Sequence, residues 1–177
     1  DKLAGTYNIG IHLRRGDYGR SYFYITPVEW YLKKLQQIWG DHPKPRLFIA
    51  TEDPALAAEF REFEPTVIGD LIDLNRAFMP NYNYLPLDTV RGDPWQLDFY
   101  PEFYILSKCD TLLIPNSTFS FAAAMLNINC RSLYRSNMLK QCFEEIDPWN
   151  AYPLTRDKVE NHPEIPGISL KTNPYWI

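Results

Sequence analysis

Short apolar runs alternate along this chain with segments whose apolar residues recur at helical spacing. Residues 7–13 alternate apolar positions with smaller or polar ones, as a strand does, and residues 46–51 form a short apolar run suited to a buried parallel strand. Between them, Thr26-Pro27-Val28-Glu29 predicts a capping box at the start of a helix over about 27–39. Asp53-Pro54 predicts the start of a second helix. This order of elements indicates an α/β fold.

The same alternation returns after an irregular, proline-containing stretch. The elements predicted there are a strand over 66–68, a loop-rich insertion from Gly69 to Gln96, a helix over 99–109, a strand over 111–115, a helix capped at Asn116-Ser117-Thr118, and a strand over 131–134. The predicted fold is a Rossmann-like, doubly wound parallel sheet. We expect residues 1–150 to form this domain and the proline-rich residues 151–177 to be a tail packed on it.

Composition restricts the partners. The formal net charge of −4 argues against nucleic-acid binding, so any anion site has to be local. The sequence has no run of about 18 uncharged apolar residues, which predicts a soluble chain without a membrane segment. Its 3 cysteines lack C-x-x-C spacing and favour a place in the core over a disulfide or a zinc site.

Two arginines follow the first predicted strand directly. Arg14 and Arg15 are placed to bind a phosphate through paired hydrogen bonds at the sheet edge, where ligands of such folds lie. The alternative is that they are surface charges or pair with Asp17 and Glu52. Both interpretations stay open from the residues alone.

A second polar segment follows the predicted strand over 111–115. Residues 116–120, Asn-Ser-Thr-Phe-Ser, put hydroxyls and free backbone N–H groups at a helix start, where an anion is favoured. Ordinary helix capping is the alternative. Asn116 also begins a glycosylation sequon, for which we expect a structural role.

Many transferases that use a sugar nucleotide stabilise the leaving diphosphate with a divalent metal held by an Asp-x-Asp pair, which this sequence lacks. Arginine together with a helix N-terminus supplies comparable stabilisation of a leaving diphosphate. A phosphatase, sulfotransferase or P-loop enzyme has less support, because neither a Cys-x5-Arg loop nor a Gly-x4-Gly-Lys-Ser/Thr segment is present.

Three ordered motifs resemble those of the fucosyltransferase superfamily. His12 to Tyr18, which reads His-Leu-Arg-Arg-Gly-Asp-Tyr, resembles the first motif of the α1,2-fucosyltransferases and, more loosely, of the α1,6 and protein O-fucosyltransferases. Ile49 to Pro54 and Glu102 to Asn127 resemble the second and third motifs. The resemblance implies the C-terminal, nucleotide-binding half of a GT-B glycosyltransferase, with the acceptor-binding domain absent from this chain.

The resemblance also implies roles for single residues. Arg14 would grip the diphosphate with support from Arg15, while Ser117, Thr118 and Phe119 would line the phosphate and ribose. His12 and Asp53 would lie near the base or ribose. Glu102 stands where the family has an aspartate that binds guanine. Some relatives have a catalytic glutamate shortly after the first motif, which this sequence lacks; Asp17 is the nearby carboxylate and therefore the candidate catalytic base, and its alternative role is to fix the arginine loop.

The implied activity is inverting, metal-independent transfer of fucose from GDP-fucose to a sugar hydroxyl of a glycan acceptor, without a cofactor. The alternative is a nucleotide-sugar-binding module without activity of its own. The location would be cytoplasmic for a bacterial or viral protein and the Golgi lumen for a fragment of a eukaryotic transferase.

Overall fold

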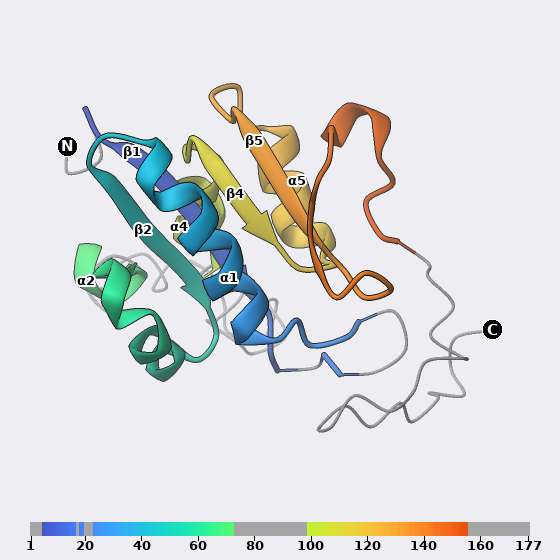
Figure 1. Cartoon of the computed structure of the whole chain (residues 1–177), viewed down its shortest axis with the longest axis horizontal. Helices are drawn as coiled ribbons and strands as arrows, with labels where there is room; N and C mark the ends of the chain where they lie inside the picture. The colour runs from blue at the N-terminus through green and yellow to red at the C-terminus, as the bar shows by residue number, and fades with distance from the viewer. Residues whose placement is uncertain (1–4, 17, 20–22, 73–98, 156–177) are drawn as a thin grey trace, which may run out of the picture.

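The computed structural model describes residues 5–16, 18–19, 23–72 and 99–155. Its strands are β1 (Tyr7–Leu13), β2 (Pro45–Thr51), β3 (Thr66–Val67), β4 (Thr111–Ile114), β5 (Ser132–Asn137) and β6 (Cys142–Glu145). They form a 6-stranded sheet in the order β3-β2-β1-β4-β5-β6 (Figure 1). β1 to β5 pair in parallel, and β6 is antiparallel to β5. The predicted Rossmann-like α/β fold is confirmed, because 3-2-1-4-5-6 is the strand order of that fold.

Helices lie between the strands in the chain. They are α1 (Val28–Ile38), η1 (Trp39–Asp41), η2 (Pro54–Phe63), α2 (Ile68–Leu71), α4 (Phe99–Leu106), α5 (Thr118–Met125) and η5 (Pro148–Asn150). Most of the predicted insertion lies outside the described residues, as do residues 156–177 of the predicted tail. Within the parts of the chain that are described, no helix is both long and apolar enough to cross a membrane.

The core has two layers because side chains of a strand alternate between the faces of the sheet. Ile9, Ile11 and Leu13 pack with residues of α1 and η2 on one face. The opposite face holds Leu112 and Ile114 against α4 and α5. The sheet is therefore covered on both faces, as a doubly wound fold requires.

Gly10 allows α4 to approach the central strand closely. A β-carbon built at this position would lie 3.0 Å from Cδ2 of Leu106, the last residue of α4, and 2.8 Å from Sγ of Cys109 in the segment after it. Both distances are shorter than van der Waals contact, so a larger residue would force the packed layers apart. Cys109 is buried here, and the three cysteines are free thiols.

Two local predictions were wrong. The capping box at Thr26 does not form, because Thr26 Oγ1 donates to Ser136 Oγ at 3.0 Å and α1 begins without a side-chain cap. The predicted last strand over 131–134 continues to Asn137 and returns as β6, which the sequence did not predict. By contrast, Asp53 caps η2 as predicted, accepting from the Ala55 N–H at 3.2 Å.

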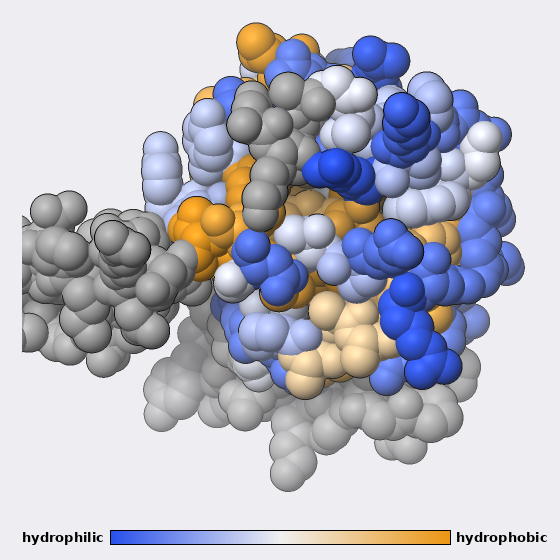
Figure 2. All heavy atoms as spheres, turned by 90° about the vertical axis from the view of Figure 1, so that its left-hand side faces the viewer, coloured by the Kyte–Doolittle hydropathy of each residue, from blue (hydrophilic) through white to orange (hydrophobic). Residues whose placement is uncertain are grey.

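Figure 2 shows the side of the molecule at the left of Figure 1, on which α2 lies, and here orange apolar side chains alternate with blue hydrophilic ones. A recess of about 160 Å³ is lined by Asn8, Arg46, Leu47, Phe48, Thr66, Asp70 and Leu71. Asn8 and Arg46 are the second residues of β1 and β2, near the amino ends of these strands. The recess therefore does not include the residues at the carboxyl ends of the strands.

Candidate functional site

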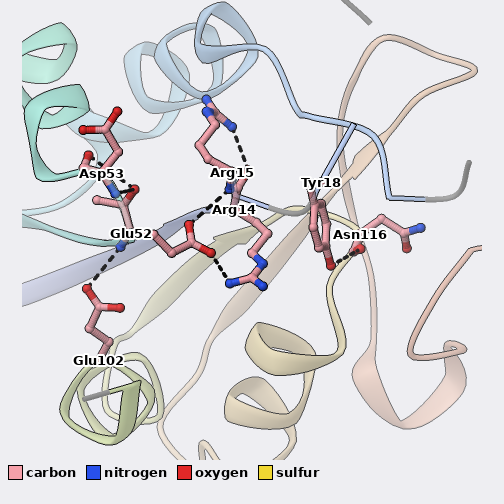
Figure 3. Close-up of polar contacts among 8 residues, drawn as sticks. Arg14, Arg15, Tyr18, Glu52, Asp53, Glu102 and Asn116 are labelled. Atoms are coloured by element: carbon pink, nitrogen blue, oxygen red, sulfur yellow. Dashed lines mark hydrogen bonds and ion pairs between the residues drawn. The ribbon is translucent and has the colours of Figure 1, made fainter. Parts of the chain in front are cut away.

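The strand order reverses direction between β1 and β4. β1 continues to β2 and β3 on one side, while β4 continues to β5 on the other. Connections that leave on opposite sides open a crevice at the carboxyl ends of the two central strands, and ligands of doubly wound sheets bind there. Arg14 follows β1 and Asn116 follows β4, so both predicted polar segments begin at this switch point (Figure 3).

Arg14 is held at the switch point by neighbours on two sides. Its Nη1 forms an ion pair with Glu52 Oε1, and its guanidinium carbon lies 5.3 Å from the centre of the Tyr18 ring. The Tyr18 hydroxyl donates to the carbonyl oxygen of Asn116 at 3.1 Å. Tyr18 therefore connects the chain after β1 with the chain after β4, and the arginine lies beside that connection.

Arg15 points away from Arg14, on the other side of the strand end (Figure 3). Its Nη1 donates to the Arg14 carbonyl at 3.0 Å, and its backbone N–H donates to Glu52 Oε2 at 3.1 Å. Successive residues of an extended chain face opposite sides, so only one of the two guanidinium groups can lie directly over the crevice. Arg15 therefore brings its positive charge and its backbone N–H to this edge, while its guanidinium lies on the other side of the strand end.

His12 lies inside the sheet edge and not on the surface. It is 3% exposed, its ring centre is 5.1 Å from that of Phe119, and its carbonyl accepts from Tyr31 Oη at 2.7 Å. Burial, with the charges of Arg14 and Arg15, lowers the pKa of His12 to about 3. The imidazole is therefore neutral at physiological pH, and its Nδ1 has no hydrogen-bond partner among the described residues.

The start of α5 forms the other side of the switch point. Ser117 is the N-cap residue, is buried, and makes no side-chain cap hydrogen bond. Thr118 is exposed, and Phe119 packs edge-on against Phe99 and Phe103. The predicted capping role of Ser117 is thus not seen, while the N-terminal dipole of α5 points at the crevice end of β4.

Asn116 is a structural residue at the centre of the site. Its side chain is fully buried, donates from Nδ2 to the Thr155 carbonyl at 3.0 Å, and accepts at Oδ1 from the Thr155 N–H at 2.9 Å. This pair of bonds attaches residues 151–155, the first part of the predicted tail, to the end of β4. The buried amide leaves no room for a glycan, as we expected for this sequon.

Asn116→Ala should lower the free energy of unfolding by about 1 to 3 kcal/mol, because it leaves the Thr155 N–H and carbonyl without their partners in a partly buried site. Urea denaturation measures this loss directly. Asn129→Ala, at an exposed position where Asn127 Oδ1 accepts from the Asn129 backbone N–H, provides a control that should cost far less. Equal stability of the two variants would show that the Thr155 connection contributes little.

Three carboxylates lie around the end of β2, beside the arginines. Glu52 and Asp53 follow the strand directly, and Glu102 reaches it from α4, accepting the Thr51 N–H at 3.1 Å (Figure 3). Burial raises the pKa of Glu102 to about 7, while the Thr51 hydrogen bond lowers it and the Glu52 charge raises it. This carboxyl group therefore changes charge near neutral pH. Asp17, the remaining predicted site carboxylate, lies outside the described residues.

The structure thus brings most of the predicted site residues to one edge of the sheet. His12, Arg14 and Ser117 to Phe119 lie at the switch point itself, and Asp53 and Glu102 lie one strand further along, at β2. Sequence reasoning placed Tyr18 at this edge without giving it a role, did not identify Thr155, and named Glu52 only as an alternative partner of the arginines. Glu52 carries a usable signal, because it directly follows a predicted strand beside Asp53.

The fold and these residues define a Rossmann-like α/β domain with an arginine after β1 and a helix N-terminus after β4 at its switch point. Among solved structures, the chain is similar to NodZ alpha-1,6-fucosyltransferase, crystallised and soaked with GDP-fucose, with a TM-score of 0.49 and 15% sequence identity. The match covers 82% of this chain and 44% of that chain, so this chain spans less than half of that protein's length. No protein-family profile and no curated protein sequence matches.

Proposed function

We propose that this chain binds GDP-fucose at the switch point and is the donor-binding part of a fucosyltransferase of the GT-B type. The observation that carries the proposal is the position of Arg14, whose guanidinium follows β1 while the N-terminus of α5 follows β4 across the same crevice. A diphosphate between them would meet a permanent cation and a helix N-terminus. The resemblance of the three sequence motifs to those of fucosyltransferases supports GDP as the nucleotide and fucose as the sugar.

The remaining donor contacts follow from the resemblance and from what lies near the crevice. In this proposal Arg15 adds charge beside the diphosphate, while Ser117, Thr118 and Phe119 line the phosphate and ribose. His12 and Asp53 lie near the base or ribose. The neutral state of His12 fits such a role, because a neutral imidazole can accept a hydrogen bond as well as donate one.

Glu102 is the proposed guanine-binding residue. One of its oxygens accepts from Thr51, which fixes the carboxylate at the end of β2. An ionised carboxylate can accept two hydrogen bonds from the N1 and N2 groups of guanine, whereas uracil does not present that pair of donors. Bound guanine would also favour the charged form of Glu102, in opposition to its burial.

The proposed chemistry is an inverting displacement. An acceptor sugar hydroxyl attacks the anomeric carbon of fucose, the bond from that carbon to the diphosphate oxygen breaks, and GDP leaves with the bonding electrons. Arg14 and the start of α5 stabilise the charge that develops on the diphosphate. A carboxylate, for which Asp17 is the candidate, takes the hydroxyl proton. The acceptor site would be provided by another domain or another chain.

GDP and GDP-fucose should raise the melting temperature without added metal, and the rise should persist in the presence of a chelator. The reason is that Arg14, Arg15 and the helix N-terminus supply the positive charge that the diphosphate needs. Thermal melting with GDP, with and without EDTA, measures this. Stabilisation that depends on added magnesium or manganese would contradict the proposal.

Turnover distinguishes the proposed enzyme from a binding module. The full-length protein and this chain would be incubated with GDP-fucose and a glycan acceptor, and released GDP would be measured. Binding of GDP-fucose without release of GDP by either protein would favour the module.

A further inference from the structure

We propose that Glu52 is an internal competitor for the diphosphate: its carboxylate occupies the anion-binding cradle formed by Arg14, Arg15 and Gly16, and the donor has to displace it. This inference rests on the proposed function, since it concerns the same diphosphate position. The inference goes beyond the proposed function because it gives Glu52, which directly follows β2, a role in regulating the affinity for the donor.

The geometry of the cradle is that of an anion site. Glu52 Oε1 accepts from Arg14 Nη1, and Oε2 accepts from the Arg15 backbone N–H at 3.1 Å. Gly16 has a φ of +50°, and a β-carbon built there would lie 3.9 Å from Oε1, so the backbone of Gly16 lies beside the carboxylate. A guanidinium and a strand-end N–H are the donors that a phosphate oxygen would use, and here a carboxylate already holds both.

The carboxylate is held in a way that permits its displacement. The side chains of Arg14 and Glu52 are 32% and 39% exposed, and ion pairs with this much access to water contribute little to stability. Glu52 is also at the surface end of its strand, so its side chain can turn into solvent without unpacking the core. A diphosphate carries more negative charge than one carboxylate and competes well for the same donors.

Arg14 does not depend on Glu52 alone for its position. Its guanidinium also lies over the Tyr18 ring, and Tyr18 is fixed by its hydrogen bond to the Asn116 carbonyl. When Glu52 leaves, this contact with Tyr18 keeps the arginine near the crevice. This distinguishes a competitor, whose removal strengthens ligand binding, from a positioning residue, whose removal weakens it.

The carboxylates next to Glu52 also favour its displacement when a diphosphate binds. Asp53 and Glu102 lie near the same strand end, and a diphosphate would add further negative charge to this edge. An ionised Glu52 beside a bound diphosphate would repel it, so ligand binding favours the state in which Glu52 has moved away. The apparent affinity for the donor is then reduced by the fraction of free protein in which the cradle is filled.

The test is calorimetric titration of the intact chain with GDP, inorganic pyrophosphate and guanosine, using the wild type, Glu52→Gln and Glu59→Gln. Glu59→Gln makes the same change of charge at an exposed position of η2. We expect Glu52→Gln to bind GDP and pyrophosphate about three to ten times more tightly than the wild type. Guanosine, which has no phosphate, should bind equally to all three proteins, and Glu59→Gln should behave like the wild type.

The gain should also become smaller when Arg14 is absent, so Arg14→Ala and the double variant Arg14→Ala/Glu52→Gln should differ less in pyrophosphate affinity than the wild type and Glu52→Gln do. Weaker or unchanged binding of GDP by Glu52→Gln, with wild-type binding intact, would overturn the inference and leave the proposed function standing. If none of the proteins binds GDP or pyrophosphate while all melt like the wild type, both the proposed function and this inference are wrong.

Discussion

Arg14→Ala is expected to weaken GDP binding by about 1.5 to 3 kcal/mol, the scale of a lost hydrogen bond to a charged group. Transfer should lose about 2 to 4 kcal/mol of transition-state stabilisation, by analogy with removal of one oxyanion donor. Stability should change by less than about 0.5 kcal/mol, because the Arg14 ion pair with Glu52 is exposed to solvent. Calorimetry with GDP and thermal melting of the unliganded protein measure the two effects separately.

Arg14→Lys should also bind GDP less tightly, although the charge is kept, because lysine lacks the planar fork that makes two parallel hydrogen bonds. Arg15→Lys is the matched comparison and should be milder, since the Arg15 side chain points to the other side of the strand end and its backbone N–H is unchanged. Wild-type affinity in both Arg14 variants would remove the central residue of the proposal. A collapse of the melting temperature without ligand would instead make Arg14 structural.

Glu102→Gln is expected to stabilise the unliganded protein at pH 8 by about 1 to 3 kcal/mol. The Glu102 pKa is about 7 in the folded protein against an ordinary value of 4.5. Between these two values the folded state keeps a proton that the unfolded chain has released, so the wild type loses stability as the pH rises through this window. Glutamine can still accept the Thr51 N–H but cannot ionise, so the loss should be absent from the variant.

The same substitution should weaken binding of GDP by about 1 to 3 kcal/mol and binding of UDP by less, because an amide cannot accept both guanine donors. Urea denaturation at pH 5 and pH 8, with Glu59→Gln as the control, tests the stability effect, and calorimetry with the two nucleotides tests the binding effect. A gain in stability with equal, small losses for GDP and UDP would leave Glu102 a buried carboxyl without a role in recognising guanine.

The central strands and most helices could be predicted because their signals are local. Periodicity and capping residues located β1, β2, α1 and the start of η2 within one or two residues. β6 was missed because Cys142–Glu145 is short and forms only by pairing with β5. The capping box at Thr26 failed for a related reason, since Ser136 lies far away in the sequence and competes for the same hydroxyl.

The residues of the candidate site that follow a predicted strand could be predicted from the sequence. Arg14 and Ser117 follow predicted strands, and the topology of a parallel sheet brings such positions to one edge. Which partner Arg14 would choose remained open in the sequence, and the structure shows Glu52. The connection of Asn116 to Thr155 spans 39 residues and has no local signal, so only the folded chain shows that the start of the tail completes this edge.

The claim that the donor binds at the switch point is tested most directly by locating the bound nucleotide. Hydrogen–deuterium exchange with and without GDP measures this. We predict slower exchange at the backbone amides of Arg15, Gly16, Thr118 and Phe119, with no change at Thr66 to Leu71, which line the recess between β2, β3 and α2. Protection confined to that recess, or calorimetrically detected GDP binding without protection at either strand end, would contradict the assignment of the donor site to the switch point.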